Sequence, residues 1–371
     1  MQNLVSTRRR LTACGLAFGL LTAAPVWSQD VSKVATESAV KLPQVMILAT
    51  GGTIAGTGAT STTTVGYTAA KIAVDALIDA VPDIKKVANV KGEQVFQIAS
   101  ENMTNEYWLT LAKRVNALLA QSDVDGIVIT HGTDTIEETA YFLNLVVKSQ
   151  KPVVIVGAMR PATAISADGP INLYNAVILA GSKEAVGKGV LVCLNDQING
   201  ARDVTKTNTS TADTFRTPEL GFLGYMQDNK PRFYRESTRK KTLDTEFDVA
   251  NLTSLPRVDI AYGYANEDRV AIDAFVAAGA KGIVHAGPGD GSLARPAVEP
   301  SLIDARKKGI LIVRSSRVGN GVVARNGEAK DDELDFVVSD TLNPQKARIL
   351  LMLALTKTAD AKEIQRMFYT Y

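Results

Sequence analysis

Continuous apolar runs alternate with stretches of helical periodicity through the first half of the chain. The runs at 45–50, 126–130 and 152–159 are rich in valine, isoleucine and leucine and end near glycine or threonine. Between them, residues 69–81 and 135–147 carry the alternation of apolar and polar positions that is typical of helices. Uninterrupted apolar strands joined by helices indicate a parallel sheet that is covered on both faces. The pattern therefore predicts an α/β domain.

Regular patterns thin out over 200–255 and then resume. A second alternation of apolar runs and helical stretches starts after Pro256 and finishes in a long helical pattern at 343–356. Because proline often marks the entry to a new structural unit, we place a domain boundary there. The sequence predicts an N-terminal α/β domain with the larger, parallel, flavodoxin-like sheet, a linker, and a smaller C-terminal α/β domain, at 43–235, 236–255 and 256–371.

The first 28 residues have the pattern of a signal peptide. Three arginines, Arg8–Arg10, precede an apolar run that closes on small residues near Ser28. The run is about 15 residues long, which favours cleavage over a membrane anchor. We expect cleavage after Ser28, with Ala24 as the alternative, then a polar spacer at 29–42, and a periplasmic location. The sequence leaves the general and the twin-arginine export routes open.

Composition excludes several classes of protein. The chain has 371 residues, of which 46% are hydrophobic and 22% charged, as in ordinary globular proteins. Removing the leader takes three arginines from 41 basic residues and leaves 38 against 39 acidic ones. A net charge near −1 predicts no nucleic-acid or anionic-membrane surface. Only Cys193 would remain in the mature chain, so no intrachain disulfide is expected.

Polar residues follow three of the predicted strands at the point where each strand ends. Thr53 comes after the first run, Ser100 and Glu101 come after "FQIA", and Thr133 and Asp134 come after "IVIT". Each could simply cap a following helix. In open α/β sheets, however, ligands bind at the carboxyl ends of the strands. Three such loops at one edge of the sheet favour a binding or catalytic site.

The available side chains limit the chemistry of such a site. The glycines of "ATGGTIAGTG" lack the lysine and the spacing of nucleotide-binding loops. Only two histidines exist, His131 and His285, and no cluster has metal-ligand spacing, so neither a metal nor a cofactor is expected. We interpret His131 as structural. A threonine nucleophile remains, activated by a lysine or a tyrosine, with Gly51 and Gly52 allowing backbone N–H groups to approach an oxyanion.

Five segments of the chain carry a resemblance to a known family. They read "ILATGGTIAG", "ITHGTDTIEETAYFL", "VGAMRPATAISADGPINLYNA", "RDVTKTN" and "LNPQKARILLMLALT". The chain resembles the bacterial type II, periplasmic L-asparaginases and glutaminase-asparaginases over nearly all of 43–371. The resemblance implies hydrolysis of the side-chain amide of L-asparagine, and secondarily of L-glutamine. It also implies a homotetramer whose sites lie between subunits.

Matching motifs assign catalytic roles by resemblance. Thr53 takes the place of the nucleophile, and Tyr67 lies on the flap that closes over it. Thr133 and Asp134, together with Lys206, resemble the second catalytic group of the family.

The resemblance also assigns residues to the substrate. Ser100, Thr133 and Asp134 would bind its α-carboxylate and α-amino group, and the backbone of Ala158 would contact the amide. Glu101 stands where some strict asparaginases carry glutamine, and the carboxylate also occurs in enzymes with more glutaminase activity.

Further substrate contacts are implied from a neighbouring subunit. Ser292 in "GDGSL" and Glu328 in "RNGEAKDD" match by position, with Glu333 as the alternative to Glu328.

Two other functions fit parts of the pattern. An exported amino-acid-binding protein would also use hydroxyls, an aspartate and backbone N–H groups in a cleft. A buried lysine is harder to explain in such a protein, because burying an ammonium group costs several kcal/mol unless it is compensated. The second alternative is an amidase for a larger amide.

Overall fold

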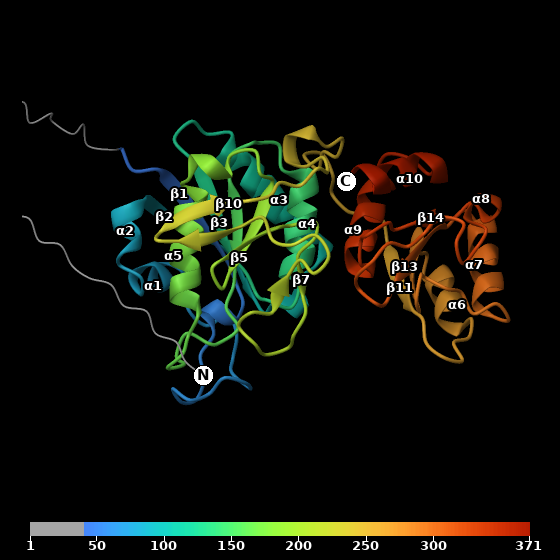
Figure 1. The fold of residues 1–371 in the computed structure, drawn as a ribbon, viewed down its shortest axis with the longest axis horizontal. Helices are drawn as coiled ribbons and strands as arrows, with labels where there is room; N and C mark the ends of the chain where they lie inside the picture. Colours follow the sequence, from blue (N-terminus) through green and yellow to red (C-terminus); the bar gives the residue numbers. More distant parts are fainter. Residues whose placement is uncertain (1–40) are drawn as a thin grey trace, which may run out of the picture. The chain divides into compact units, whose positions relative to one another are not determined.

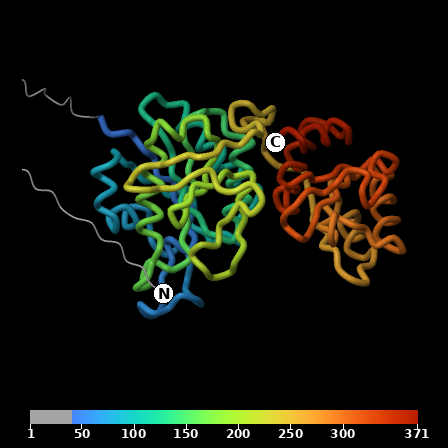
Figure 2. The backbone as a smooth tube through the Cα atoms, in the orientation of Figure 1, coloured from blue at the N-terminus to red at the C-terminus, as the bar shows by residue number. Residues whose placement is uncertain are grey.

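The computed structural model describes residues 41–371, and the predicted leader with its cleavage position lies outside them. Residues Leu42–Tyr371 form one compact unit. It contains an eight-stranded sheet and a four-stranded sheet. All strands of the larger sheet precede those of the smaller one in the sequence, and Figure 2 shows the backbone of the first part in blue to yellow and that of the second in orange to red. No helix within 41–371 has the length and apolar character needed to cross a membrane.

The larger sheet has a parallel part and an antiparallel edge. Its order is β10-β9-β6-β5-β4-β3-β1-β2 (Figure 1). The parallel strands, in spatial order, are β2 (Asn89–Ile98), β1 (Gln44–Gly51), β3 (Gly126–Thr130), β4 (Val153–Val156) and β5 (Val190–Leu194). The antiparallel strands are β6 (Gln197–Gly200), β9 (Gly224–Gln227) and β10 (Lys230–Phe233). The order 2-1-3-4-5 of the parallel part is that of flavodoxin-like sheets, as predicted.

Helices cover both faces of this sheet, which explains the uninterrupted apolar strands. In β3, Ile127 and Ile129 belong to the hydrophobic cluster that includes the buried residues of two helices, α3 (Asn105–Leu119) and α4 (Ile136–Val146). Val128 belongs to the cluster on the opposite face, which includes residues of α1 (Val74–Asp79), α2 (Ile84–Val87) and α5 (Gly169–Ala180). Successive side chains of a strand point to opposite faces, so every position of β3 is buried.

The helix expected over 69–81 is shorter than predicted. Residue Ala70 has a φ of 55°, outside the helical region, and α1 begins only at Val74. The backbone before α1 bonds to the loop after β1 instead: Ala70 N donates to Gly52 O at 3.0 Å, and Ile72 N donates to Ala55 O at 3.0 Å. These tertiary hydrogen bonds take the place of the first helical turn.

The smaller sheet is wholly parallel. Its strands, in spatial order, are β11 (Val258–Tyr262), β12 (Gly282–Gly287), β13 (Leu311–Ser316) and β14 (Val337–Val338). The hydrophobic cluster on one face includes residues of α6 (Val270–Ala277) and α7 (Val298–Lys307). On the other face pack α9 (Pro344–Ala354) and α10 (Ala361–Thr370). Helix α9 also contacts α4, so it lies between the two sheets (Figure 1).

Two further features matter below. A short pair of strands, β7 (Thr205–Lys206) and β8 (Phe215–Arg216), follows β6. Cys193 is fully buried in β5, and burial raises the pKa of its thiol to about 12.

Candidate active site

The three polar loops of the sequence meet at one edge of the larger sheet. Strands β2, β1 and β3 are neighbours, and their carboxyl ends lead into Ser100–Glu101, Thr53 and Thr133–Asp134. In a sheet of this order the reversal between β1 and β3 is where ligands bind. An open cavity of about 330 Å³ lies there. Its walls include seven predicted site residues: Thr53, Tyr67, Ser100, Glu101, Thr133, Asp134 and Lys206.

The hydroxyl group of Thr53 faces a tyrosine. Thr53 opens a short 3-10 turn, Thr53–Ala55, directly after β1, and its side chain is buried. Its Oγ1 lies 2.7 Å from the Tyr67 hydroxyl, and either oxygen can donate the hydrogen bond. Tyr67 belongs to a segment whose ends are joined where Thr57 and Thr68 pair as an antiparallel bridge. A threonine hydroxyl in a cavity, hydrogen-bonded to a group that can accept or relay a proton, is suited to nucleophilic attack.

The glycines before Thr53 allow two loops to touch. Gly52 has a φ of 83°, and a Cβ placed on it would lie 2.3 Å from the backbone nitrogen of Gly132. Only glycine fits, because any side chain would push the loops after β1 and β3 apart. The N–H of Gly52 itself donates to Ile98 O at 3.0 Å, so an oxyanion contact would come from other backbone N–H groups. The glycine pair instead brings Thr53 close to the "HGTDT" loop.

Lys206 joins the two residues after β3. It lies at the end of β7, and its Nζ donates to Thr133 Oγ1 at 3.0 Å and to Asp134 Oδ1 at 2.6 Å. The side chain of Lys206 is 17% exposed and that of Asp134 is 60% exposed. Thr133 itself is buried. The arrangement places a cation beside a hydroxyl that faces the cavity, where it can polarise that hydroxyl or exchange a proton with it.

The other predicted substrate-binding residues differ in their exposure. Ser100 is buried, and its backbone oxygen accepts a hydrogen bond from Thr135 Oγ1 at 2.8 Å, which ties the loop after β2 to the loop after β3. Glu101 is exposed. Ala158 is fully buried and does not line the cavity, which is bordered instead by its neighbour Met159.

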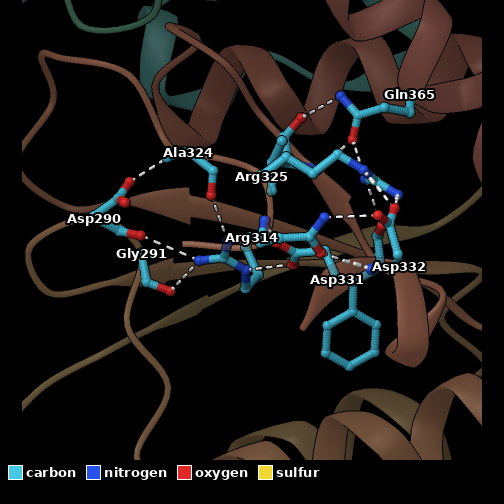
Figure 3. A network of polar contacts seen from close by, with 11 residues as sticks. Asp290, Gly291, Arg314, Ala324, Arg325, Asp331, Asp332 and Gln365 are labelled. Atoms are coloured by element: carbon cyan, nitrogen blue, oxygen red, sulfur yellow. Dashed lines mark hydrogen bonds and ion pairs between the residues drawn. The ribbon is translucent and has the colours of Figure 1, made fainter. Parts of the chain in front are cut away.

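Ser292 and Glu328 do not line this cavity within their own chain. Glu328 and Glu333 border another open space of about 480 Å³, beside α7 and the short helix α8 (Asp331–Leu334). The loops that carry Ser292 and Glu328 are held together by Arg314 of β13, which is completely buried (Figure 3).

All five N–H donors of Arg314 have acceptors. Its Nε and Nη2 donate to the two carboxylate oxygens of Asp331 at 2.6 and 2.7 Å. Nη1 donates to the carbonyls of Asp290 and Gly291, both at 3.1 Å, and Nη2 also donates to Ala324 O at 3.0 Å (Figure 3). Burying a charged pair is favourable only when its remaining donors are satisfied, as they are here.

His131 is part of a buried hydrogen-bond chain. Its Nδ1 lies 2.8 Å from Gly132 O, so Nδ1 carries the proton, and Nε2 accepts from Thr139 Oγ1 at 2.9 Å. Trp108 Nε1 in turn donates to Thr139 Oγ1 at 2.9 Å. Both ring nitrogens are occupied without a charge, and burial lowers the pKa of His131 to about 4. These contacts support a structural role for His131.

The contribution of His131 to the stability of the protein should therefore decrease as the pH falls from about 6.5 to about 4. In this window the unfolded chain binds a proton at His131 and the folded chain does not, so protonation favours unfolding, by about 3 kcal/mol at the lower end. Glu138, whose pKa burial raises to about 7, contributes in the opposite direction over this range, so the effect of His131 is measured as the difference in urea midpoint between wild type and a variant. A His131→Gln variant, measured alongside, should lose this part of the pH dependence; an unchanged slope in the variant would assign it to other groups.

Several contributors to the cavity were not found from the sequence alone. Thr209 and Ser210 line it from the segment after Lys206, and Thr64 and Val65 line it from the segment before Tyr67. These residues lie in loops without helix or strand periodicity. The only sign of them in the sequence is that they adjoin Tyr67 and Lys206, which the family resemblance indicates. Among residues 41–371, no three His, Cys, Asp or Glu side chains are grouped to hold a metal ion.

Comparison with known proteins agrees over the whole described region. The family model described as "Asparaginase, N-terminal" matches residues 44–239, and the "Glutaminase/Asparaginase C-terminal domain" matches 257–368. The chain is 58% identical to L-asparaginase 2 of Bacillus subtilis over 344 residues, covering 93% of this chain and 91% of that protein. It is 53% identical to the glutaminase-asparaginase of Pseudomonas fluorescens biotype A, covering 96% of this chain and 97% of that protein. A crystal structure titled as a probable cytoplasmic L-asparaginase from Campylobacter jejuni superposes with a TM-score of 0.86 at 52% identity, covering 89% of this chain and 100% of that one. The chain therefore belongs to the asparaginase family.

Proposed function

We propose that this protein hydrolyses the side-chain amide of L-asparagine, and secondarily that of L-glutamine, with Thr53 as the nucleophile. The observation that carries the proposal is the single cavity in which the Thr53–Tyr67 pair faces the same space as Thr133, Asp134 and Lys206. The names of the two relatives, an L-asparaginase and a glutaminase-asparaginase, support the choice of amides.

The reaction would proceed through an acyl-enzyme. Thr53 Oγ1 forms a bond to the amide carbon while its proton is relayed through the Tyr67 hydroxyl, or through Thr133 and Lys206, each of which passes on a proton of its own toward the leaving nitrogen. Peptide N–H groups of the cavity wall stabilise the oxyanion. The C–N bond then breaks, and the nitrogen takes up a proton and leaves as ammonia. Water attacks the ester carbon, releases aspartate or glutamate, and restores the threonine hydroxyl.

The backbone end of the substrate would be held by the opposite wall. An α-ammonium group can pair with Asp134, whose carboxylate is 60% exposed and accessible from the cavity. Ser100 would bind the α-carboxylate, and the backbone of Ala158 would contact the amide only if the substrate reaches past the neighbouring Met159, which borders the cavity. This arrangement directs the side-chain amide toward Thr53.

We also propose an assembly of four copies in which Ser292 and Glu328 complete the cavity of a neighbouring subunit. Support comes from the position of these residues, away from the cavity of their own chain, and from the rigid anchoring of their loops by Arg314. The proposed division into domains at 43–235 and 256–371, with a linker at 236–255, is supported by the end of β10 at Phe233 and the start of β11 at Val258.

For its location we propose export to the periplasm after cleavage at Ser28. The support is the arginine-led apolar leader. The Campylobacter jejuni protein, by contrast, is titled as cytoplasmic. The N-terminal residue of the mature protein, read by Edman degradation after expression with the leader, tests this proposal.

The direct test of function is ammonia release from L-asparagine and L-glutamine by the purified protein lacking residues 1–28. Turnover of asparagine together with slower turnover of glutamine supports the proposal. Binding of either amino acid without ammonia release would favour the amino-acid-binding protein. Release of ammonia only from larger amides would favour the other amidase.

Glu101 should influence the choice between the two amides. It adds a second carboxylate to the wall that would hold the α-ammonium group. Asparagine and glutamine differ by one methylene, which a pocket discriminates by only about 1–3 kcal/mol, so small shifts at the ammonium end change the ratio. We expect Glu101→Gln to lower kcat/KM for glutamine proportionally more than for asparagine, measured for both amides at neutral pH. Equal proportional losses would show that Glu101 anchors both substrates alike.

A further inference from the structure

The start of α9 carries a buried cation that the proposed reaction does not use. Lys346 lies in the first turn of α9 and is 2% exposed. Its backbone N–H is capped by Asn343 Oδ1 at 3.1 Å, which fixes the first turn. Lysine is almost never fully buried unless it is paired or fully hydrogen-bonded, so its partners indicate its role.

The partners of Lys346 lie in the segment that leads to Lys206. Its Nζ donates to Arg202 O at 2.8 Å and also to Val204 O. These two carbonyls flank Asp203, between the end of β6 and the start of β7. One ammonium group from α9 therefore holds the backbone at two points just before Lys206.

The same turn of α9 also bonds to the helix that follows Thr133 and Asp134, the two partners of Lys206. Gln345 Nε2 donates to Glu137 Oε1 at 2.9 Å. Glu137 is buried in the first turn of α4, which begins just after Thr133 and Asp134. The start of α9 thus makes hydrogen bonds with both segments that Lys206 connects.

The electrostatics fit a fixed position rather than a mobile side chain. Burial lowers the pKa of Lys346 to about 8, while the charges of Glu137 and Asp203 favour its protonated form. An ammonium group without the two carbonyls would be an unsatisfied charge in the interior, so loss of either contact is strongly disfavoured.

We propose that the start of α9 is a positioning element for the reaction, in which Lys346 and Gln345 fix the backbone before Lys206 against the helix after Asp134, and so set the contact between Lys206 and Thr133. The inference rests on the proposed role of Lys206. A displacement of about 1 Å in a reacting group can cost 10²-fold in rate, so the effect should fall on turnover.

The test compares Lys346→Met with the wild type and with Lys346→Arg, at a temperature where each variant is folded. We expect Lys346→Met to lower kcat for asparagine by about 10- to 100-fold, with KM changed less than about threefold. Lys346→Arg, which keeps the charge and several donors, should recover much of the rate.

The matched control is Lys151→Met. Lys151 Nζ also donates to two backbone carbonyls, those of Leu119 and Gln121 at 3.0 and 2.6 Å, but at the opposite end of the strands. This variant should lose stability and keep its kcat within about twofold of wild type. An equal loss of kcat in both variants would overturn the inference, because the effect would then follow from stability alone.

A second readout separates this inference from the proposed role of Lys206. If Lys346 acts through Lys206, adding Lys346→Met to Lys206→Met should lower kcat by less than about twofold. If Lys346→Met lowered kcat equally in the wild type and in Lys206→Met, the inference would be overturned and the role of Lys206 would stand. An unchanged kcat in folded Lys346→Met would have the same consequence. An unchanged kcat in Lys206→Met would overturn the role of Lys206 and the inference together.

If Lys346→Met does not fold, Gln345→Ala replaces it, because its side chain is only partly buried. This variant removes the bond to the buried Glu137, and we expect kcat to fall about threefold with a small drop in melting temperature. An unchanged kcat in this variant would overturn the inference.

Discussion

Replacing Thr53 by alanine should lower kcat on L-asparagine by several orders of magnitude, on the order of 10³-fold or more, while the protein keeps its fold. The substitution removes the hydroxyl that would form the acyl-enzyme and leaves the other cavity residues in place. The stability cost should be small, because the Tyr67 hydroxyl, its partner at 2.7 Å, borders an open cavity and can bond to water. Steady-state ammonia release and the melting temperature measure the two effects.

The control for this substitution is Thr57→Ala. Thr57 lies four residues further along the same loop and does not line the cavity, so its kcat should stay close to wild type. If Thr53→Ala kept more than about a tenth of wild-type turnover, the barrier would have risen by only ~1.4 kcal/mol, and Thr53 would not be the nucleophile.

The second large effect is expected for Lys206→Met. Lys206 Nζ lies 3.0 Å from Thr133 Oγ1, and loss of a group that transfers or polarises a proton typically costs about 10²–10⁴ in rate. The change in KM should be smaller. Lys206 Nζ lies 2.6 Å from Asp134 Oδ1, so removing Lys206 frees the Asp134 carboxylate to pair with the substrate's α-ammonium group. Separate determination of kcat and KM for asparagine measures this split.

Lys206→Arg distinguishes two modes of action. Arginine keeps the positive charge but does not give up its proton at neutral pH. If Lys206 acts as a neutral base, the arginine variant should be as slow as the methionine variant. If it acts through its charge, the arginine variant should keep much of the rate. An unchanged kcat with a raised KM in Lys206→Met would instead make Lys206 an anchor for the substrate carboxylate.

Much of the larger sheet was predictable because its parallel strands are buried on both faces. Strands such as β3, which is buried at every position, must then be largely apolar, and such runs are visible in the sequence. The antiparallel edge was not predicted, since β6, β9 and β10 are only four residues long and none of them is buried at every position. The early start predicted for α1 was wrong because the backbone at Ala70 bonds to the loop after β1 instead of forming a helical turn.

The sheet topology predicts that the residues after β1, β2 and β3 lie together, but it does not predict the contacts that Tyr67 and Lys206 make with them. Neighbouring parallel strands bring Thr53, Ser100 and Thr133 to one edge whatever the loops contain. The contact of Tyr67 with Thr53 spans 14 residues and that of Lys206 with Thr133 spans 73. Helix or strand periodicity gives no sign of either contact, and only the family resemblance indicated these residues.

Buried charges were the hardest feature to predict. Arg314 interrupts an apolar strand, and Lys346 lies in the polar first turn of a helix, where a lysine is usually interpreted as solvated. Their burial depends on acceptors supplied by distant segments, at Asp331 for Arg314 and at Arg202 and Val204 for Lys346.

The buried thiol of Cys193 makes the molecule convenient for site-specific labelling. It is the only cysteine in residues 41–371, it is fully buried, and burial raises the pKa of its thiol to about 12, so it is a poor nucleophile toward maleimides. Val65, in the segment before Tyr67, is 72% exposed and borders the cavity. A fluorophore attached to a cysteine introduced at Val65 would therefore be the single dye on each chain that lacks the leader, and its emission would report directly on how this segment responds when an amide enters.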